Sequence, residues 1–276
     1  MIKRKLKKVF YKFFNKRYKP VEDLSVLTQI DKFHIDTQHL RTKTSYKIAF
    51  IIPDMKGHSG GHTAILKLGT ALAEYGHEIF YITYKNMSVN SMRENAKVNT
   101  SSYKGSFLKL DEIKNTVFDI GVSTFWLSAY YLLKYDKNFL YKMSYLLDFE
   151  SSFYALGDDY LLANQTYNMG FHLVSLGAWN QNQVKDFFPN SRCDRIDFPI
   201  DISNYPIIER EILIEKSFDV AIYIKQLSKR APDFLVVLMH YLTKAFEQNG
   251  YQINFKVIGM SQRIVIDIGE NMGTLT

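Results

Sequence analysis

The sequence predicts an α/β protein with a parallel, doubly wound sheet, followed by the start of a second, similar unit. Short apolar runs typical of buried strands alternate with segments whose apolar residues recur every three or four positions, which is helical spacing. The alternation begins near residue 46, breaks near residue 206 and resumes near residue 217. Strands that alternate with helices pair in parallel, because each helix returns the chain to the same end of the sheet.

The first strand–loop–helix–strand unit, residues 46–84, is the best-defined part of this pattern. An apolar strand ends at Pro53, and a loop of small residues leads to Gly60 and Gly61 at the start of a helix. Two glycines let a ligand approach the backbone without a Cβ in the way, and the helix N-terminus favours a phosphate or a sugar oxygen. A tight turn without a ligand is the alternative, because the spacing is not that of the G-x-G-x-x-G motif.

The alternation continues through a first domain at residues 46–205. We expect residues 85–110 to be irregular, since Asn, Ser and Lys are prominent there. Later in this domain, strands are expected at 118–126, 142–150, 171–177 and 193–198, and helices at 127–135, 158–170 and 179–188. In the second unit, strands are expected at 218–224 and 253–259, and a helix at 232–250.

The second unit, residues 206–276 with its linker, is short. Only 60 residues run from 217 to 276, whereas a doubly wound domain usually needs about 100. We therefore expect a second domain that is only begun and a chain that is truncated at its C-terminus.

Basic residues gather at the start of the chain. The formal net charge is +7, but residues 1–19 contain nine Lys or Arg and no acid, and the remainder carries 26 basic against 28 acidic residues. A near-neutral body excludes the basic footprint of a nucleic-acid-binding fold. The single cysteine, Cys193, excludes an internal disulfide and suits a reducing cytosol.

Residues 1–19 have the pattern of a basic amphipathic helix. Such a helix suits an anionic membrane surface, whereas a solvated tail or a helix packed on the protein are the alternatives. We expect it to hold the protein at the cytoplasmic face of the cell membrane, with residues 20–45 as a connector. The apolar residues that share one face are Ile2, Leu6, Val9, Phe10, Phe13 and Phe14.

Three stretches resemble a known family. Ile52-Pro-Asp and Gly60-Gly-His-Thr-Ala-Ile65 resemble the N-terminal domain of two-domain bacterial glycosyltransferases. Residues 145–179, which begin Tyr-Leu-Leu-Asp-Phe-Glu, are similar to a second signature found in the rhamnosyltransferases of surface-polysaccharide assembly. Residues 223–230 look like the opening of that family's C-terminal domain. The resemblance covers residues 46–276.

The resemblance implies a GT-B fold, in which two Rossmann-like domains face each other across a cleft. It implies a transferase that moves a sugar, rhamnose by the closest match, from a nucleotide sugar such as dTDP-rhamnose to a growing cell-surface glycan or lipid-linked glycan. No cofactor or metal is expected, because basic side chains and helix N-termini neutralise the leaving diphosphate. The seven histidines accordingly show no clustered metal-ligand spacing.

The resemblance also implies donor-binding residues. Lys225, Lys229 and Arg230 lie in the loop after the first strand of the second domain, where cations would stabilise charge that develops on the diphosphate. Ordinary solvated charge is the alternative. Gly60 and Gly61 would face the same diphosphate from the opposite wall.

Acids, histidines and one tryptophan are the remaining candidates. Asp148 and Glu150 follow a buried strand, and either could orient an acceptor hydroxyl or remove its proton. Helix capping or a buried hydrogen bond to a neighbouring loop are their alternatives. His58 and His62 could bind the acceptor or the donor phosphate, or be surface histidines. Trp179 could stack on a sugar ring, although core packing explains most aromatic residues.

Two readings compete with an active transferase. The family's later acidic motif, which holds the donor sugar and ribose, has no counterpart before Thr276, so the chain could be an inactive fragment that keeps the acceptor and membrane-binding parts. A membrane-associated scaffold would explain residues 1–19, but not the glycine loop or the 145–179 signature.

Overall fold

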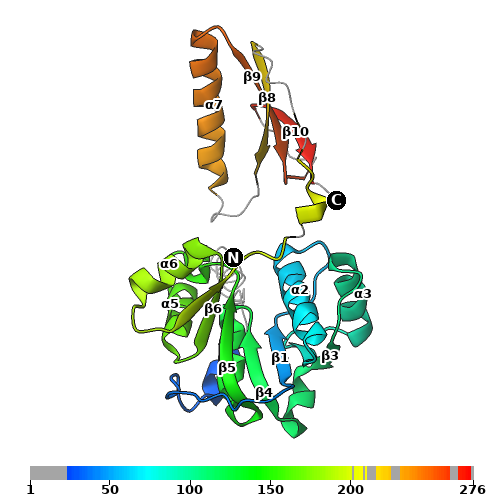
Figure 1. Cartoon of the computed structure of the whole chain (residues 1–276). Helices are drawn as coiled ribbons and strands as arrows, with labels where there is room; N and C mark the ends of the chain where they lie inside the picture. The colour runs from blue at the N-terminus through cyan, green and yellow to red at the C-terminus, as the bar shows by residue number, and fades with distance from the viewer. Residues whose placement is uncertain are drawn as a thin grey trace, which may run out of the picture.

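The computed structural model describes residues 24–200, 202–207, 209, 216–224, 231–261 and 267–274. Its larger unit is a seven-stranded sheet in which all neighbouring strands are parallel, in the order β3-β2-β1-β4-β5-β6-β7 (Figure 1). The predicted α/β, doubly wound fold class is confirmed. The strands are β1 (Lys47–Ile52), β2 (Glu78–Thr83), β3 (Ser106–Lys109), β4 (Phe118–Ser123), β5 (Phe139–Leu146), β6 (His172–Leu176) and β7 (Cys193–Ile196).

The strand order places helices on both faces of the sheet. The chain winds outward from β1 to β3, and then from β4, beside β1, outward to β7. Because such crossovers are right-handed, opposite winding directions put their helices on opposite faces (Figure 1). One face carries α2 (Gly60–Glu74) and α3 (Val89–Asn99), and the other carries α4 (Trp126–Lys134), α5 (Asp158–Gln165) and α6 (Ala178–Phe187).

Each face of the sheet has its own apolar core, as alternation along β1 shows. Ala49 and Ile51 pack towards α4, whereas Phe50 and its neighbours on the same face pack towards α2 and α3. Helix α4 is buried along residues 126–133, because a 3-10 helix at Leu24–Gln29 covers it from outside. The centre of the sheet is therefore a rigid base for the loops that follow its strands.

The connector before β1 is docked on the larger unit. We call residues 30–45 the strap. The Gln38 side chain accepts from the Lys142 backbone N–H at 2.6 Å and donates to the carbonyl of the same residue at 3.1 Å. Ile35 N–H donates to the Met169 carbonyl at 2.9 Å, and Lys43 forms an ion pair with Asp119. The strap thus joins the starts of three strands.

Two local expectations were wrong. Residues 85–110 contain α3 and β3, because tertiary contacts and an N-cap at Ser88 stabilise a helix that buries only Met92 and Ala96. Strand β5 ends at Leu146, so Asp148 and Glu150 lie in the loop and 3-10 turn beyond it. The apolar run of this strand continues into its loop, which hid the boundary.

The described part of the second unit is a small parallel sheet, ordered β10-β9-β8, with one helix packed on it (Figure 1). Met239 of the helix is buried among sheet residues that include Phe255 and Val257. Pro232 opens this helix, where its missing N–H is harmless. Strand β10 was not expected from the sequence. The elements are β8 (Ser217–Tyr223), α7 (Pro232–Gln248), β9 (Gln252–Ile258) and β10 (Glu270–Gly273).

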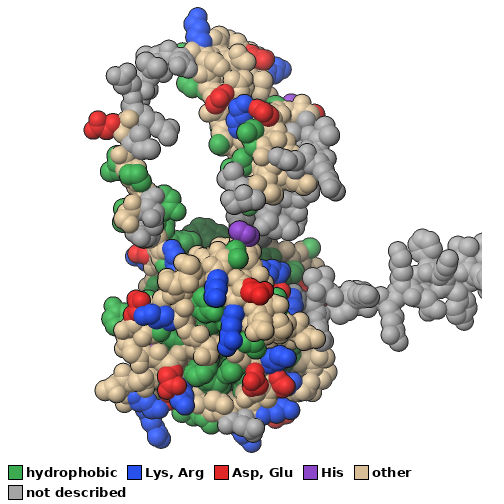
Figure 2. Space-filling model, turned by 90° about the vertical axis from the view of Figure 1, so that its right-hand side faces the viewer, with side chains coloured by type: hydrophobic (Ala, Val, Ile, Leu, Met, Phe, Trp, Pro, Cys, Tyr) green, Lys and Arg blue, Asp and Glu red, His purple; other side chains and the backbone are tan. Residues whose placement is uncertain are grey.

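Surface charge on the larger unit is mixed. Basic and acidic side chains are interspersed over the side that Figure 2 presents, as expected for a near-neutral body. Among the described residues, no helix has the length and apolar character needed to cross a membrane. The amphipathic helix expected at residues 1–19 lies outside the described residues.

Candidate active site

The candidate site lies at the carboxyl edge of the larger sheet. The strand order reverses between β1 and β4, and open α/β sheets bind ligands outside the strand ends at such a point. Loops after β1, β4, β5 and β6 meet there, and three helices begin there. The loops after β1, β5 and β6 carry or lead into residues that the sequence drew attention to.

Helix α2 begins with an open N-terminus. Ser59 is the N-cap, but its side chain accepts from His62 N–H at a long 3.5 Å, and the N–H groups of Gly60 and Gly61 have no partner in the described part of the chain. A Cβ added to Gly60 would meet nothing within 4 Å, whereas one on Gly61 would lie 3.3 Å from the Leu147 side chain. The helix therefore presents free N–H donors beside open space, which is the requirement for binding an anion.

Helix α3 holds the loop that leads into α2. The Asn95 side chain donates to the Met55 carbonyl at 2.7 Å. Asn99 donates to the Lys56 carbonyl at 2.6 Å and accepts from Ser59 N–H at 2.8 Å. Sequence reasoning missed both asparagines because it assigned no helix here. Their four-residue spacing on one helix face was the available signal.

His62 is paired with an acid that sequence reasoning also missed. Its Nε2 lies 4.0 Å from Asp54, and its Nδ1 accepts from Lys56 N–H at 3.4 Å. Burial lowers the pKa of His62, which the nearby Asp54 only partly opposes. The imidazole is therefore neutral at pH 7, with its remaining N–H towards Asp54. His58, in contrast, is exposed and adopts a left-handed backbone with φ 52°.

Glu150 faces the protein interior. It is 7% exposed, and its carboxylate accepts from Trp126 N–H, the first residue of α4, at 2.5 Å. A carboxylate at a helix N-terminus is stabilised by the helix dipole. Backbone N–H of Glu150 in turn donates to the Tyr167 hydroxyl at 2.9 Å. Of the roles left open by the sequence, the capping role is the one this geometry fits.

Asp148 and Trp179 lie closer to solvent along the same edge. Asp148 is half-buried, and its carboxylate accepts from Phe149 N–H at 2.9 Å. Trp179, at the start of α6, is 59% exposed, so it does not serve core packing. The Asn180 side chain donates to the Leu146 carbonyl at 2.9 Å and holds the start of α6 against the end of β5.

The structure thus gathers many of the sequence candidates at one edge. Leu147, whose side chain a Cβ on Gly61 would meet, directly precedes Asp148, so the start of α2 and the acidic loop are neighbours. Lys225, Lys229 and Arg230 lie outside the described residues. The candidates along the edge are His58, Gly60, Gly61, His62, Asp148, Glu150 and Trp179.

Within the described residues, no three His, Cys, Asp or Glu side chains are grouped as metal ligands would be. Cys193 is half-buried, and burial raises the pKa of its thiol to about 11. The thiol is therefore protonated at neutral pH and a poor nucleophile.

The overall architecture is that of the GT-B glycosyltransferase fold. Among solved structures with this arrangement is a point mutant of TarM from S. aureus, with a TM-score of 0.53 and 8% sequence identity. The match covers 78% of this chain and 72% of the TarM chain, and that crystal structure is a complex with fondaparinux, alpha-GlcNAc-glycerol and UDP. No protein-family model and no curated protein matches the sequence. Identity this low shows a shared fold and no residue correspondence.

Proposed function

We propose that this protein is a glycosyltransferase that moves a sugar from a nucleotide sugar to a cell-surface glycan. The observation that carries the proposal is the open N-terminus of α2 at the switch point of a GT-B fold. A fold neighbour crystallised with UDP and two glycans or glycan analogues supports it. Rhamnose, supplied as dTDP-rhamnose, is the donor that the sequence resemblance favours.

The roles proposed for the donor-binding residues follow from the negative charge of the leaving diphosphate. Departure of a nucleoside diphosphate places negative charge on phosphate oxygens, and fixed N–H donors that face this charge lower the barrier. Gly60 and Gly61 supply such donors, and Lys225, Lys229 and Arg230 are proposed to supply cations from the second unit. No cofactor or metal takes part in this scheme.

The acceptor is proposed to bind beside Asp148. Because His62 is neutral, it suits a hydrogen bond to an acceptor hydroxyl better than the neutralisation of a phosphate. Asp148 is the acid that could remove the proton of that hydroxyl, since the Glu150 carboxylate is already bound inside the protein. Trp179 offers an exposed ring for a sugar face, and the exposed His58 a further hydrogen bond.

Nucleotide binding tests this proposal. Calorimetric titration of the full chain with dTDP and with dTDP-rhamnose should give saturable binding at one site. Gly60→Val places a branched side chain in the open space beside the free N–H groups, without a clash in the free protein. We expect it to weaken binding at least tenfold, about 1.4 kcal/mol.

Gly157→Val is the matched control, because Gly157 likewise lies at the start of a helix, as its N-cap, and has open space around it. It should leave binding within twofold. Absence of nucleotide binding, or equal binding by Gly60→Val, would contradict the proposal. Nucleotide binding without sugar transfer to any glycan acceptor would favour the inactive fragment.

We also propose that an anionic membrane surface is a partner, through residues 1–19. The nine cations of this segment motivate the proposal. Deleting residues 1–19 should release the protein from phosphatidylglycerol-containing vesicles, and salt should weaken binding of the intact chain. Equal vesicle binding with and without the segment would show that the attachment lies elsewhere.

A further inference from the structure

Half of one sheet face carries no described helix. Helices α2 and α3 cover this face over β1–β3, but a cavity of about 750 Å³ lies beside them, over β4–β7 and part of β1. Both faces of a parallel sheet are normally covered, so a bare half is a place where something binds. We call this cavity the sheet groove. Its apolar floor and its α2 wall are formed by Phe50, Val122, Met143, Val174, Ile196 and Leu72.

The size of the sheet groove suits a small molecule. It spans five neighbouring strands, which at the usual spacing makes it about 19 Å long. Its volume lies within the range of small-molecule sites. On its carboxyl side, Lys67 of α2 donates to the Pro199 carbonyl at 2.9 Å and separates the groove from the candidate active site.

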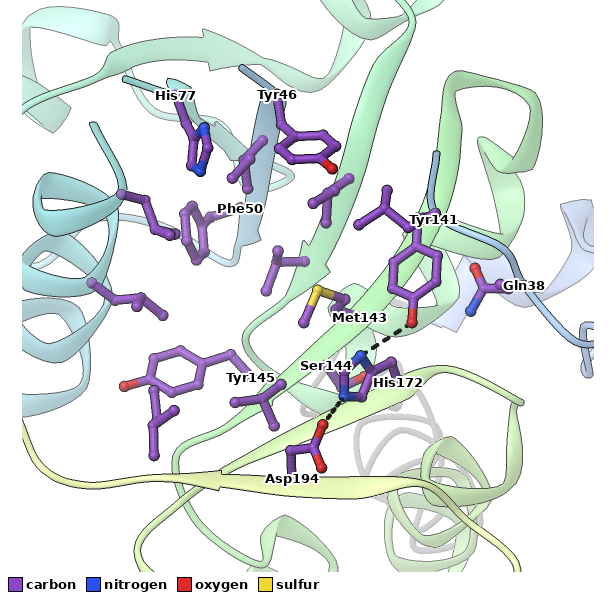
Figure 3. A pocket seen from close by; sticks show the side chains of 18 of the residues that line it. Gln38, Tyr46, Phe50, His77, Tyr141, Met143, Ser144, Tyr145, His172 and Asp194 are labelled. Carbon is purple, nitrogen blue, oxygen red and sulfur yellow. Dashed lines mark hydrogen bonds and ion pairs between the residues drawn. The ribbon is translucent and has the colours of Figure 1, made fainter. Parts of the chain in front are cut away.

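One end of the sheet groove is polar (Figure 3). The Tyr141 hydroxyl lies 3.1 Å from His172 Nδ1, and His172 Nε2 lies 2.7 Å from Asp194. The hydrogen bond from His172 lowers the pKa of Asp194, so this carboxylate is ionised and accepts the hydrogen bond from His172 Nε2. In the neutral form of His172, Nδ1 accepts from the Tyr141 hydroxyl, and the lone pairs of the Tyr141 oxygen remain for a hydrogen-bond donor. Arg192 is already shared with Asp194 at 3.4 Å.

Two further groove atoms lack partners. The Tyr145 hydroxyl is buried, on a side chain 2% exposed, and has no hydrogen-bond partner in the described part of the chain. Nδ1 of His77, at the far end of the sheet groove, is also buried and has no hydrogen-bond partner in the described part of the chain. Buried polar atoms are rarely left unpaired, and an ordered water can satisfy each of them beside an apolar occupant.

We propose that the sheet groove binds one single-chain lipid with a hydroxylated head. Its hydrocarbon chain lies over Phe50 and Val122, and its head hydroxyl donates to the Tyr141 oxygen. A carboxylate head fits less well, because it has no proton to donate and would face Asp194. The site is separate from the carboxyl edge, so lipid binding and sugar transfer succeed or fail independently.

Titration of the full chain with monomeric 1-monolauroylglycerol tests the proposal. We expect one molecule to bind, laurate to bind more weakly, and Tyr141→Phe to reduce the preference for the hydroxylated head. Val174→Phe fills the sheet groove and should weaken binding at least tenfold. Leu72→Phe should fill the groove from the α2 wall, and it replaces Val174→Phe in the test if that variant does not fold. Val117→Phe, at an exposed position, is the control and should stay within twofold.

Three results would overturn the proposal. One is no binding of monolauroylglycerol. Another is binding that neither groove-filling variant weakens. The third is a dimer, measured by light scattering, that Val174→Phe or Leu72→Phe converts to a monomer, since the occupant would then be a second copy of the chain.

Discussion

Helices α2 and α4 start next to each other at the switch point of the sheet, yet their N-termini differ. In α4, the first N–H is bound by the buried Glu150, and the Ser128 hydroxyl accepts from the two N–H groups just before the helix. In α2, the first two N–H groups belong to glycines and have no partner in the described residues, and the Ser59 cap is long. The protein supplies an acceptor for the first N–H of α4, whereas the first two N–H groups of α2 have none in the described residues and are the donors that we propose for a ligand.

The comparison shows how an acid near a candidate active site can be structural. Asp148 and Glu150 are two residues apart, but only Glu150 points into the protein, where it replaces water at the start of α4. Proximity to the carboxyl edge is therefore a weaker guide to catalysis than the question of which N–H groups are already satisfied.

Removing the α4 cap should have the largest effect. Glu150→Ala should lower the free energy of unfolding by about 2–3 kcal/mol, because it leaves a buried helix N–H without its charged acceptor. Glu150→Gln keeps an acceptor oxygen and should cost about half as much. Urea unfolding followed by circular dichroism measures both. Asp148→Asn is the control, and should stay within about 0.5 kcal/mol. If Glu150→Ala were as stable as Asp148→Asn, the claim that Glu150 alone stabilises the fold would be wrong.

Loosening the α2 entry loop should have an intermediate effect. Asn99→Ala removes the hydrogen bonds to Lys56 and Ser59, and should cost about 1–2 kcal/mol of stability. It should also weaken dTDP binding, since the free N–H groups lose their fixed position. Asn90→Ala, at an exposed position on the same helix, should change neither quantity. Unchanged dTDP binding by Asn99→Ala would show that α3 does not position the site.

The smallest effect should come from His62 and depend on pH. Burial lowers its pKa in the folded state below the 6.5 of the unfolded chain. As pH falls below about 6.5, His62 is protonated in the unfolded state but stays neutral in the folded state. The free energy of unfolding therefore decreases. His62→Gln should therefore lose less stability than the parent between pH 7.5 and 5.5 in urea unfolding. An equal loss in both proteins would mean that His62 is not held neutral.

Much of the fold could be predicted because its first strands are long apolar runs. The runs in β1 and β2 are apolar on both faces and have only one stable environment, the centre of a parallel sheet. Helix α3 could not be predicted, because its few buried residues, Met92 and Ala96, form no apolar stripe and its stability comes from the loop it holds. Strand β10 was missed because its four residues carry no apolar pattern.

The location of the candidate site could be predicted from the sequence, but the direction of its side chains could not. Glycines before a helix and acids after a strand locate the carboxyl edge. The direction of a side chain, however, depends on residues that only the fold brings near, as with Glu150 and Trp126. The hydrogen-bonded side chains of Tyr141, His172 and Asp194 come from three separate strands, so no local sequence pattern could predict their arrangement.

The hydrogen bonds of the strap can form only after residues far along the chain have been synthesised. Its hydrogen bonds join Gln38 to Lys142 and His34 to the Asn168 carbonyl, across 104 and 134 residues. At about 5–20 residues per second, the ribosome adds the later partners roughly 5–27 s after the strap itself. Docking of the strap therefore cannot precede the central strands of the larger unit, and it completes that unit only after β5 and the residues just before β6 have been made.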